Sequence, residues 1–76
     1  MHKIVHVDVL DGFRLGLAFD DGVQGNVDLS HLAGRGVFRI WEDRSVFESV
    51  QIGSAGELVW TDQADLCADA LYLKVA

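Results

Sequence analysis

The first third of the chain alternates between apolar and polar side chains with a period of two. Successive side chains of a β-strand point to opposite faces, so strict alternation is typical of half-buried strands. The alternation therefore predicts three strands between residues 3 and 29, each with one apolar face. The apolar positions are Val5, Val7 and Val9, then Phe13, Leu15, Leu17 and Phe19, then Val23, Val27 and Leu29.

Two Asp-Gly pairs, at residues 11–12 and 21–22, separate these three strands. Asp-Gly is a strong signal for a two-residue hairpin, because a type I′ turn needs positive φ at both of its central positions. Two such turns between three alternating strands predict an antiparallel β-meander. Gly25 interrupts the third strand and is a candidate for a β-bulge.

After the meander the sequence predicts short helical pieces. Residues 28–34 are expected to form a single helical turn, with Asp28 or Ser30 as its N-cap and Gly34 after its end. The apolar stretch 36–41 is expected to be a turn or a packed loop. Asp43 is then expected to cap a short helix that runs through Val46 and Phe47.

The last part of the chain predicts a second hairpin and a C-terminal helix. Residues 49–53 and 57–61 are expected to pair through the turn at residues 54–56. Leu66, Ala70, Leu71 and Leu73 follow near helical spacing, with Asp65 as the expected cap. The whole chain, residues 1–76, is thus expected to be one small α+β domain.

The size of the domain limits how much apolar surface it can bury. A chain of 76 residues buries only about 60% of the surface that its unfolded form exposes. Half of its residues are apolar, so some of them are expected to meet a partner or a second copy. We therefore expect a homo-oligomer, a dimer or larger.

The balance of charge argues against several kinds of partner. The formal net charge is −6, with 12 acidic and 6 basic residues. Nucleic acids are held by Lys and Arg that neutralise phosphates, and here the basic residues form no stripe. We expect neither direct nucleic-acid binding nor binding to an anionic membrane, whereas a basic protein surface is compatible. The basic residues are Lys3, Arg14, Arg35, Arg39, Arg44 and Lys74.

Cysteine use and hydropathy bear on the compartment. Cys67 is the only cysteine, so no intramolecular disulfide can form, which suits a reducing compartment. The N-terminal apolar stretch is too short and too interrupted for a signal peptide. No run approaches the roughly 20 apolar residues that a membrane span needs. The sequence predicts a cytoplasmic protein.

The order of short motifs along the chain resembles a known family. Residues 19–22 (Phe-Asp-Asp-Gly) precede a strand that ends in Val-Asp-Leu at 27–29, and Gly-Val-Phe follows at 36–38. Val46-Phe47 leads to Val50, and the chain closes with Val59-Trp60, Ala64-Asp65-Leu66 and Leu71-Tyr72. This order is similar, over essentially the whole chain, to the small bacterial domain-of-unknown-function family 2442.

The resemblance implies an α+β fold in which a meander is followed by helices and a hairpin. Similar members occur as free-standing short proteins, sometimes paired with another small protein in toxin–antitoxin-like arrangements, and others carry a C-terminal helix-turn-helix domain. The resemblance implies no catalytic residues. After Trp60 this chain has Thr61-Asp62-Gln63 where members commonly read Pro-Asn-Gly, which argues against a ligand role for that turn.

Histidines and carboxylates suggest a metal site that their spacing does not favour. His2, His6 and Asp8 share one strand face, and this is a conceivable ligand set. Ligands that lie two and four residues apart on one strand splay apart instead of converging. Asp62, Asp65 and Asp69 lack the glycine and terminal glutamate of a calcium loop. We interpret the first set as a polar outer face and expect no bound metal or cofactor.

Nucleophilic residues give no better case for catalysis. Ser30 and His31 are neighbours in sequence, but a catalytic triad needs a base that a third group orients through the fold. Ser30 is better explained as a helix cap, and Cys67 as a small buried residue. Asp20 and Asp21 suit turn geometry. The sequence therefore predicts that the chain is not an enzyme.

Large aromatic residues in the second half leave two interpretations open. Trp41, Trp60 and Tyr72 are either core residues or anchors of a protein interface, where Trp and Tyr concentrate binding energy. With Leu71 and Leu73 they make up the candidate interface. The favoured hypothesis is a non-enzymatic protein-interaction module that self-associates or binds a small protein partner, with an antitoxin-like role as one form. The alternative is a small-molecule sensor domain without an attached DNA-binding domain.

Overall fold

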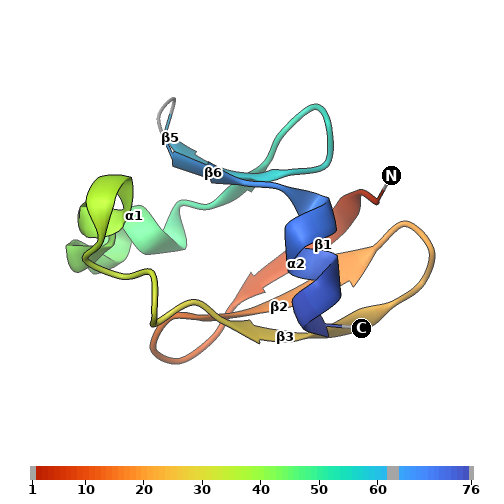
Figure 1. Cartoon of the computed structure of the whole chain (residues 1–76), viewed down its shortest axis with the longest axis horizontal. Coiled ribbons are helices and arrows are strands. Elements are labelled where there is room, and N and C mark those ends of the chain that lie inside the picture. The colour runs from red at the N-terminus through yellow and green to blue at the C-terminus, as the bar shows by residue number, and fades with distance from the viewer. Residues whose placement is uncertain (1, 62–63, 76) are drawn as a thin grey trace.

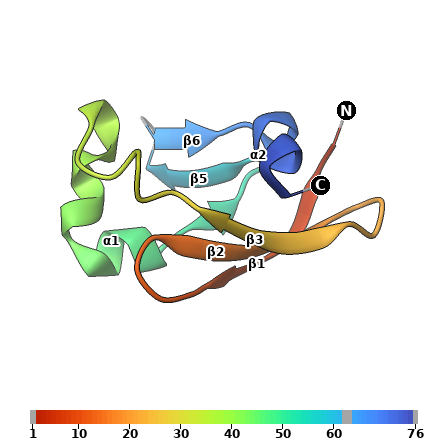
Figure 2. The same ribbon diagram turned by 60° about the horizontal axis from the view of Figure 1, so that its bottom comes forward.

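Two three-stranded antiparallel sheets lie over one another in this computed structural model, with helices at the ends of the stack (Figures 1 and 2). The structure describes residues 2–61 and 64–75. The predicted α+β class is confirmed. The first sheet contains β1 (Ile4–Val9), β2 (Arg14–Phe19) and β3 (Gln24–Asp28), and the second contains β4 (Gln51–Ile52), β5 (Leu58–Thr61) and β6 (Ala64–Leu66). The helices are η1 (Gly36–Glu42, a 3-10 helix), α1 (Arg44–Glu48) and α2 (Ala68–Val75).

The predicted meander is confirmed, but the predicted type I′ turns are wrong. Among the described residues only glycines have positive φ, 60° at Gly12 and 91° at Gly22. At the second turn the Gly22 N–H donates to the Phe19 carbonyl and the Phe19 N–H to the Val23 carbonyl. This is a three-residue loop that ends in a left-handed glycine. The aspartates avoid the left-handed region, which their Cβ atoms make costly.

A β-bulge near the start of β1 changes which residues face the core. The register with β2 shifts between Ile4 and His6, so that one extra residue lies on the β1 side. Ile4 is therefore only 2% exposed, whereas Val5 is 58% exposed. The sequence pattern had placed Val5 on the apolar face with Val7, because the alternation contains no sign of the extra residue.

Gly25 is not a bulge. It pairs with Leu17 in the regular register of β2 and β3. A Cβ atom at this position would lie 2.5 Å from Val75 Cγ1, so the glycine allows the end of α2 to pack closely on β3. The interruption of the strand pattern thus reflects a close approach between elements.

Most of the short elements in the second half lie where the sequence predicts them. The Asp28 side chain accepts a hydrogen bond from the Ser30 N–H at 2.8 Å and opens the turn before η1. The stretch predicted as a turn or loop is the 3-10 helix η1. Asp43 caps α1 by accepting from the Ser45 N–H. The hairpin of β4 and β5 is antiparallel, as expected.

The expected role of Asp65 as a helix cap is wrong. Asp65 lies in β6, a strand that the sequence did not predict, and pairs with Val59 of β5. The helix begins at Ala68, and the Cys67 carbonyl accepts from the Leu71 N–H in its first turn. Strand pairing with β5 decided this segment, and three residues are too few for an alternation pattern to reveal a strand.

Aromatic rings fill the centre of the core. Trp41 and Phe47 have ring centroids 5.1 Å apart, and Trp41 and Trp60 4.8 Å apart. The Trp60 indole Nε1 donates to the Phe47 carbonyl at 3.0 Å, whereas the buried Trp41 Nε1 has no partner among the described residues. The hydrogen bond from Trp60 to the Phe47 carbonyl connects β5 with α1.

The core accommodates most of the apolar residues. Four large hydrophobic side chains are exposed, each on a different element. The apolar fraction of the sequence is therefore a weaker argument for self-association than it first suggests. These residues are Val5, Val37, Ile52 and Leu73.

We expect Gly16→Ala and Gly25→Ala to change stability in opposite directions. A Cβ at Gly16 meets its nearest atom, Asn26 Oδ1, at an ordinary 3.5 Å, so alanine should raise the free energy of unfolding by about 0.5 kcal/mol. At Gly25 the contact with Val75 should cost about 1 kcal/mol. Urea denaturation of both variants measures the difference, and equal shifts would contradict the proposed role of Gly25.

The two indole groups offer a second matched pair. Trp60→Phe removes a buried hydrogen bond as well as ring volume. Trp41→Phe removes ring volume together with an N–H that has no partner in the described part of the chain. We expect Trp60→Phe to lower the free energy of unfolding by about 1 kcal/mol more than Trp41→Phe. Thermal denaturation followed by circular dichroism would test this order. A greater loss of stability in Trp41→Phe than in Trp60→Phe would contradict it.

Candidate functional site

On the solvent-facing side of the first sheet, residues of the three strands line up in two rows. Each row has a polar residue on β1, a small residue on β2 and a polar residue on β3. The register places His6 opposite Ala18 and Ala18 opposite Gln24. The next row contains Asp8, Gly16 and Asn26 in the same way. Each row has its small residue on the central strand, because Gly16 and Ala18 alternate along β2 with the buried Leu15 and Leu17.

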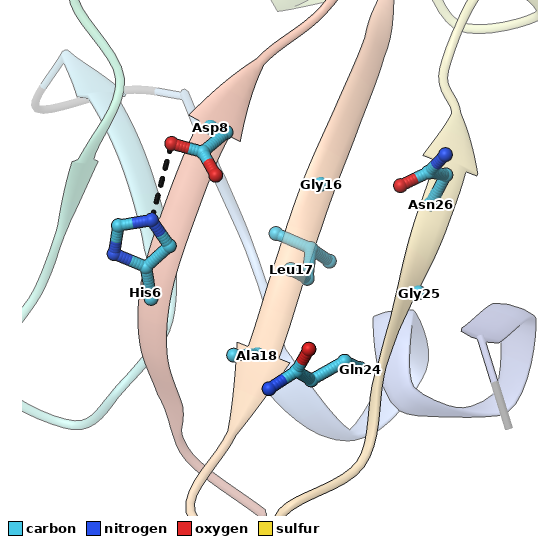
Figure 3. Close-up of a pocket in the computed structure, with 8 residues that line it drawn as sticks. All are labelled: His6, Asp8, Gly16, Leu17, Ala18, Gln24, Gly25 and Asn26. Atoms are coloured by element: carbon cyan, nitrogen blue, oxygen red, sulfur yellow. Dashed lines mark ion pairs between the residues drawn. The ribbon is translucent and has the colours of Figure 1, made fainter.

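These rows enclose a hollow with polar rims, which we call the trough. Its volume is about 430 Å³. Figure 3 shows the polar side chains of β1 on one side of β2 and those of β3 on the other. Because the floor is glycine and alanine, an approaching group can come close to the backbone of the sheet. The trough is lined by His6, Asp8, Gly16, Leu17, Ala18, Gln24, Gly25 and Asn26.

Hydrogen-bond acceptors are prominent around the trough. His6 Nε2 lies 3.1 Å from Asp8 Oδ1, and both side chains are 65% exposed. Asn26 Oδ1 is the atom nearest to the point where a Cβ of Gly16 would lie, so the amide oxygen faces the floor. Asp8 adds a carboxylate at the opposite rim. The arrangement suits a group that is rich in N–H donors.

A third row, with Arg14 opposite Asp28, continues the same face beyond the trough. The Ser30 backbone N–H, with the Ser30 side chain, lowers the pKa of Asp28 below its ordinary value of 3.8, and Arg14 adds a smaller effect in the same direction. The carboxylate of Asp28 thus offsets the positive charge of Arg14. The rim of the trough that contains Asp8 therefore stays acidic.

A second, smaller hollow lies between the N-terminus, the β4–β5 turn and the start of α2. Its volume is about 300 Å³. The His2 backbone N–H and Nδ1 both contact Asp69 Oδ1, at 2.7 and 2.9 Å. The imidazole stacks on Tyr72, whose hydroxyl donates to Asp21 at 2.7 Å. We call these four side chains the terminal clasp, because they tie the N-terminus and the β2–β3 turn to α2.

The structure divides the predicted interface residues between core and surface. Trp41, Trp60 and Leu71 are buried, at 1%, 7% and 1% exposure. Tyr72 is half-buried within the terminal clasp, and Leu73 is 81% exposed. The core interpretation of the two tryptophans is what the structure shows, and the five residues do not form one surface.

The other candidates from the sequence do not come together as a set. His6 and Asp8 pair with each other, whereas His2 turns to Asp69. In residues 2–61 and 64–75, no three His, Cys, Asp or Glu side chains are placed to hold a metal ion. Asp62 lies outside the described residues. None of the described helices is long and apolar enough to cross a membrane.

The catalytic candidates are also separated. Ser30 and His31 are exposed on the turn after β3. Cys67 is exposed instead of buried, and it lines the second hollow together with His2. The trough itself was missed by sequence reasoning, which had treated His6 and Asp8 as a plain outer face. The small residues at outward positions of β2 were the available signal.

Comparison with known proteins places the chain in a family. A family model described as "Protein of unknown function (DUF2442)" matches residues 4–76. The chain belongs to this family. No curated protein matches it.

A solved structure has the same fold as this DUF2442 chain. The crystal structure of a "putative DNA binding protein" from Nitrosomonas europaea superposes with a TM-score of 0.83 at 23% sequence identity. The match covers 99% of this chain and 49% of that one. This chain thus spans about half the length of that one.

We expect acid to loosen the terminal clasp. The Val23 N–H and then the Tyr72 hydroxyl lower the pKa of Asp21, and the His2 N–H and then its ring lower that of Asp69. A carboxylate with a lowered folded-state pKa contributes stability above its unfolded pKa, and this contribution is lost as the pH falls through the folded-state value.

Thermal denaturation from neutral pH to below the ordinary carboxyl pKa of 3.8 would measure this loss. Asp69→Asn should flatten the acid side of the profile, because position 69 then has no carboxylate to protonate. Asp11→Asn in the first turn is the matched control. A profile for Asp69→Asn that is as steep as that of the unmodified chain would contradict the role of this contact.

Proposed function

We propose that this chain is a non-enzymatic protein-interaction module that binds a small protein partner on the outer face of its first sheet. The trough is the observation that carries this proposal. An open hollow with a floor of Gly16 and Ala18 lets a partner segment lie against the sheet, and the rims offer hydrogen-bonding groups on both sides. Such a shallow polar surface is typical of protein contacts that form and separate.

The chemistry of the trough favours a basic segment of the partner. Asp8 and the amide oxygen of Asn26 are acceptors, and an arginine guanidinium supplies N–H donors in a planar fork that matches them. The net charge of −6 attracts a basic partner over longer distances and speeds encounter. An antitoxin-like role, in which the module covers a basic surface of a companion protein, is one form of this function.

Direct DNA binding is less well supported, although the Nitrosomonas europaea protein carries that description. The guanidinium of Arg44 is already engaged, donating to the Leu10 and Gly12 carbonyls and to Glu48. Arg14 lies opposite Asp28. The remaining basic residues are too few and too scattered to neutralise a row of phosphates. A role beside a DNA-binding protein agrees better with this surface.

A small-molecule sensor is the second candidate. The volume of the trough, about 430 Å³, falls within the range of about 300–1,000 Å³ for ligand sites. However, the trough lies on an open sheet face, whereas a ligand pocket usually buries most of its ligand. A concentration-dependent rise in melting temperature with a metabolite would favour this second function.

A trough-filling substitution tests the interaction function. The protein encoded by the neighbouring gene is the partner to use, and isothermal titration calorimetry the measurement. Gly16→Val should weaken binding by about tenfold or more, equivalent to ~1.4 kcal/mol, because its methyl groups occupy the floor. Asp8→Asn should weaken it as well, by removing the charged acceptor.

Ala70→Val, at an exposed position of α2, is the matched control and should bind like the unmodified chain. Size-exclusion chromatography that shows no complex with this neighbour would count against the antitoxin-like form. A complex that Gly16→Val and Ala70→Val leave equally strong would place the binding surface elsewhere.

A further inference from the structure

The first sheet ends in an edge strand that no described element covers. Among the strands that the structure describes, β3 pairs only with β2, in the order β1-β2-β3. Figure 1 shows it along the lower rim of the molecule, with no strand beyond it. Helix α2 packs on its inner face at Gly25. The side chains of Gln24, Asn26 and Asp28 are exposed.

The backbone groups that point to the open side follow from the hydrogen-bond pattern. The Phe19 N–H donates to the Val23 carbonyl, and the Leu29 N–H to the Phe13 carbonyl. Hydrogen-bonded pairs alternate along an antiparallel ladder, so Gly25 and Val27 are the β3 residues that bond to β2. The N–H and C=O groups of Gln24, Asn26 and Asp28 therefore point away from the sheet.

The opposite edge of the first sheet, along β1, is protected, whereas the edge along β3 is open. At β1 the Ile4 N–H donates to the Gly56 carbonyl, and β4 packs against the strand. The bulge at Val5 also interrupts the edge. Proteins commonly guard a free edge with a bulge, a proline, a lysine or a covering element. β3 has regular register with β2, and its sequence, Gln-Gly-Asn-Val-Asp, contains neither proline nor lysine.

We propose that β3 pairs antiparallel with β3 of a second copy of this chain, about a two-fold axis at Asn26. In this register Asn26 lies opposite Asn26 of the second copy, and Gln24 lies opposite Asp28. The five residues of the strand all pair. The outward-pointing groups form the hydrogen-bonded pairs, which gives about six backbone hydrogen bonds across the axis.

The side chains on the outer face support a second copy as the occupant. A two-fold pairing places the carboxylate of Asp28 opposite the amide of Gln24, so that no two like charges face each other. One Asp28 oxygen already accepts from the Ser30 N–H, and the other is available to the Gln24 amide. Asn26 can pair with its own copy, because a carboxamide contains both a donor and an acceptor.

The pairing joins the polar rows of the two copies into one six-stranded face. The row that contains Asp8, Gly16 and Asn26 continues across the axis into the same row of the second copy, so the two troughs come to lie on one surface. The proposal goes beyond the partner binding proposed above and does not depend on it. A single edge buries less surface than a standard interface of about 1,600 Å², so we expect a weak dimer that forms with rising concentration.

Cysteine cross-linking tests the register. In a Cys67→Ser background, Asn26→Cys places two thiols across a hydrogen-bonded pair, where Cα atoms lie about 5.5 Å apart, within the range that a disulfide needs. We expect mild oxidation to convert most of the chain to a covalent dimer. Gln24→Cys is the matched control, because its two copies would lie about 13 Å apart along the strands.

The double variant Gln24→Cys with Asp28→Cys should restore cross-linking. If Gln24→Cys alone cross-links as readily as Asn26→Cys, the proposed register is overturned. Failure of Asn26→Cys to cross-link at millimolar concentration overturns the pairing itself, and neither result bears on the partner binding that calorimetry measures.

A second measurement needs no thiol. Sedimentation velocity of the unmodified chain should show a dimer at high concentration, and Asn26→Pro should remain a monomer while circular dichroism shows the fold retained. Proline removes an N–H that points to the open side, so the β2–β3 ladder stays intact. An unmodified chain that remains a monomer over the whole range, or an unchanged dimer in Asn26→Pro, contradicts the proposal.

Discussion

The aromatic contact between the two halves of the chain is the interaction on which the rest of the structure depends. The ring centroid of Phe13, from the first half, lies 5.1 Å from that of Phe47 and 6.0 Å from that of Trp41. Trp41 in turn contacts Trp60 of the second sheet, with centroids 4.8 Å apart. The hydrogen bond from the Trp60 indole to the Phe47 carbonyl fixes the orientation of the Trp60 ring within this cluster. A thin core of this kind needs its largest side chains inside.

Because the core takes up the large apolar residues, the surface that remains for recognition is mainly polar. Three of the five residues predicted to form an interface, Trp41, Trp60 and Leu71, are buried in the core. What the structure offers in their place is the trough and the free edge of β3, which share Gln24 and Asn26. Both features use backbone proximity and hydrogen bonding, and neither requires a large apolar patch.

Glycine illustrates how one residue type serves separate purposes in this fold. Gly22 ends a hairpin loop with a positive φ that the neighbouring aspartates avoid. Gly25 makes room for Val75, so that α2 can close over β3. Gly16, where a Cβ atom would make only ordinary contacts, supplies the floor of the trough. Only the first of these purposes is local.

The sequence by itself determined the meander, the positions of its two turns, the cap at Asp43 and the β4–β5 hairpin, because alternation, Asp-Gly pairs and capping act between near neighbours. Tertiary structure decided the bulge at Val5, the strand that contains Asp65 and the burial of Trp41 and Trp60. It also decided the trough, whose rims come from β1 and β3 and face each other only after both have paired with β2. Such features depend on contacts between segments distant in sequence, and no local pattern of residues specifies them.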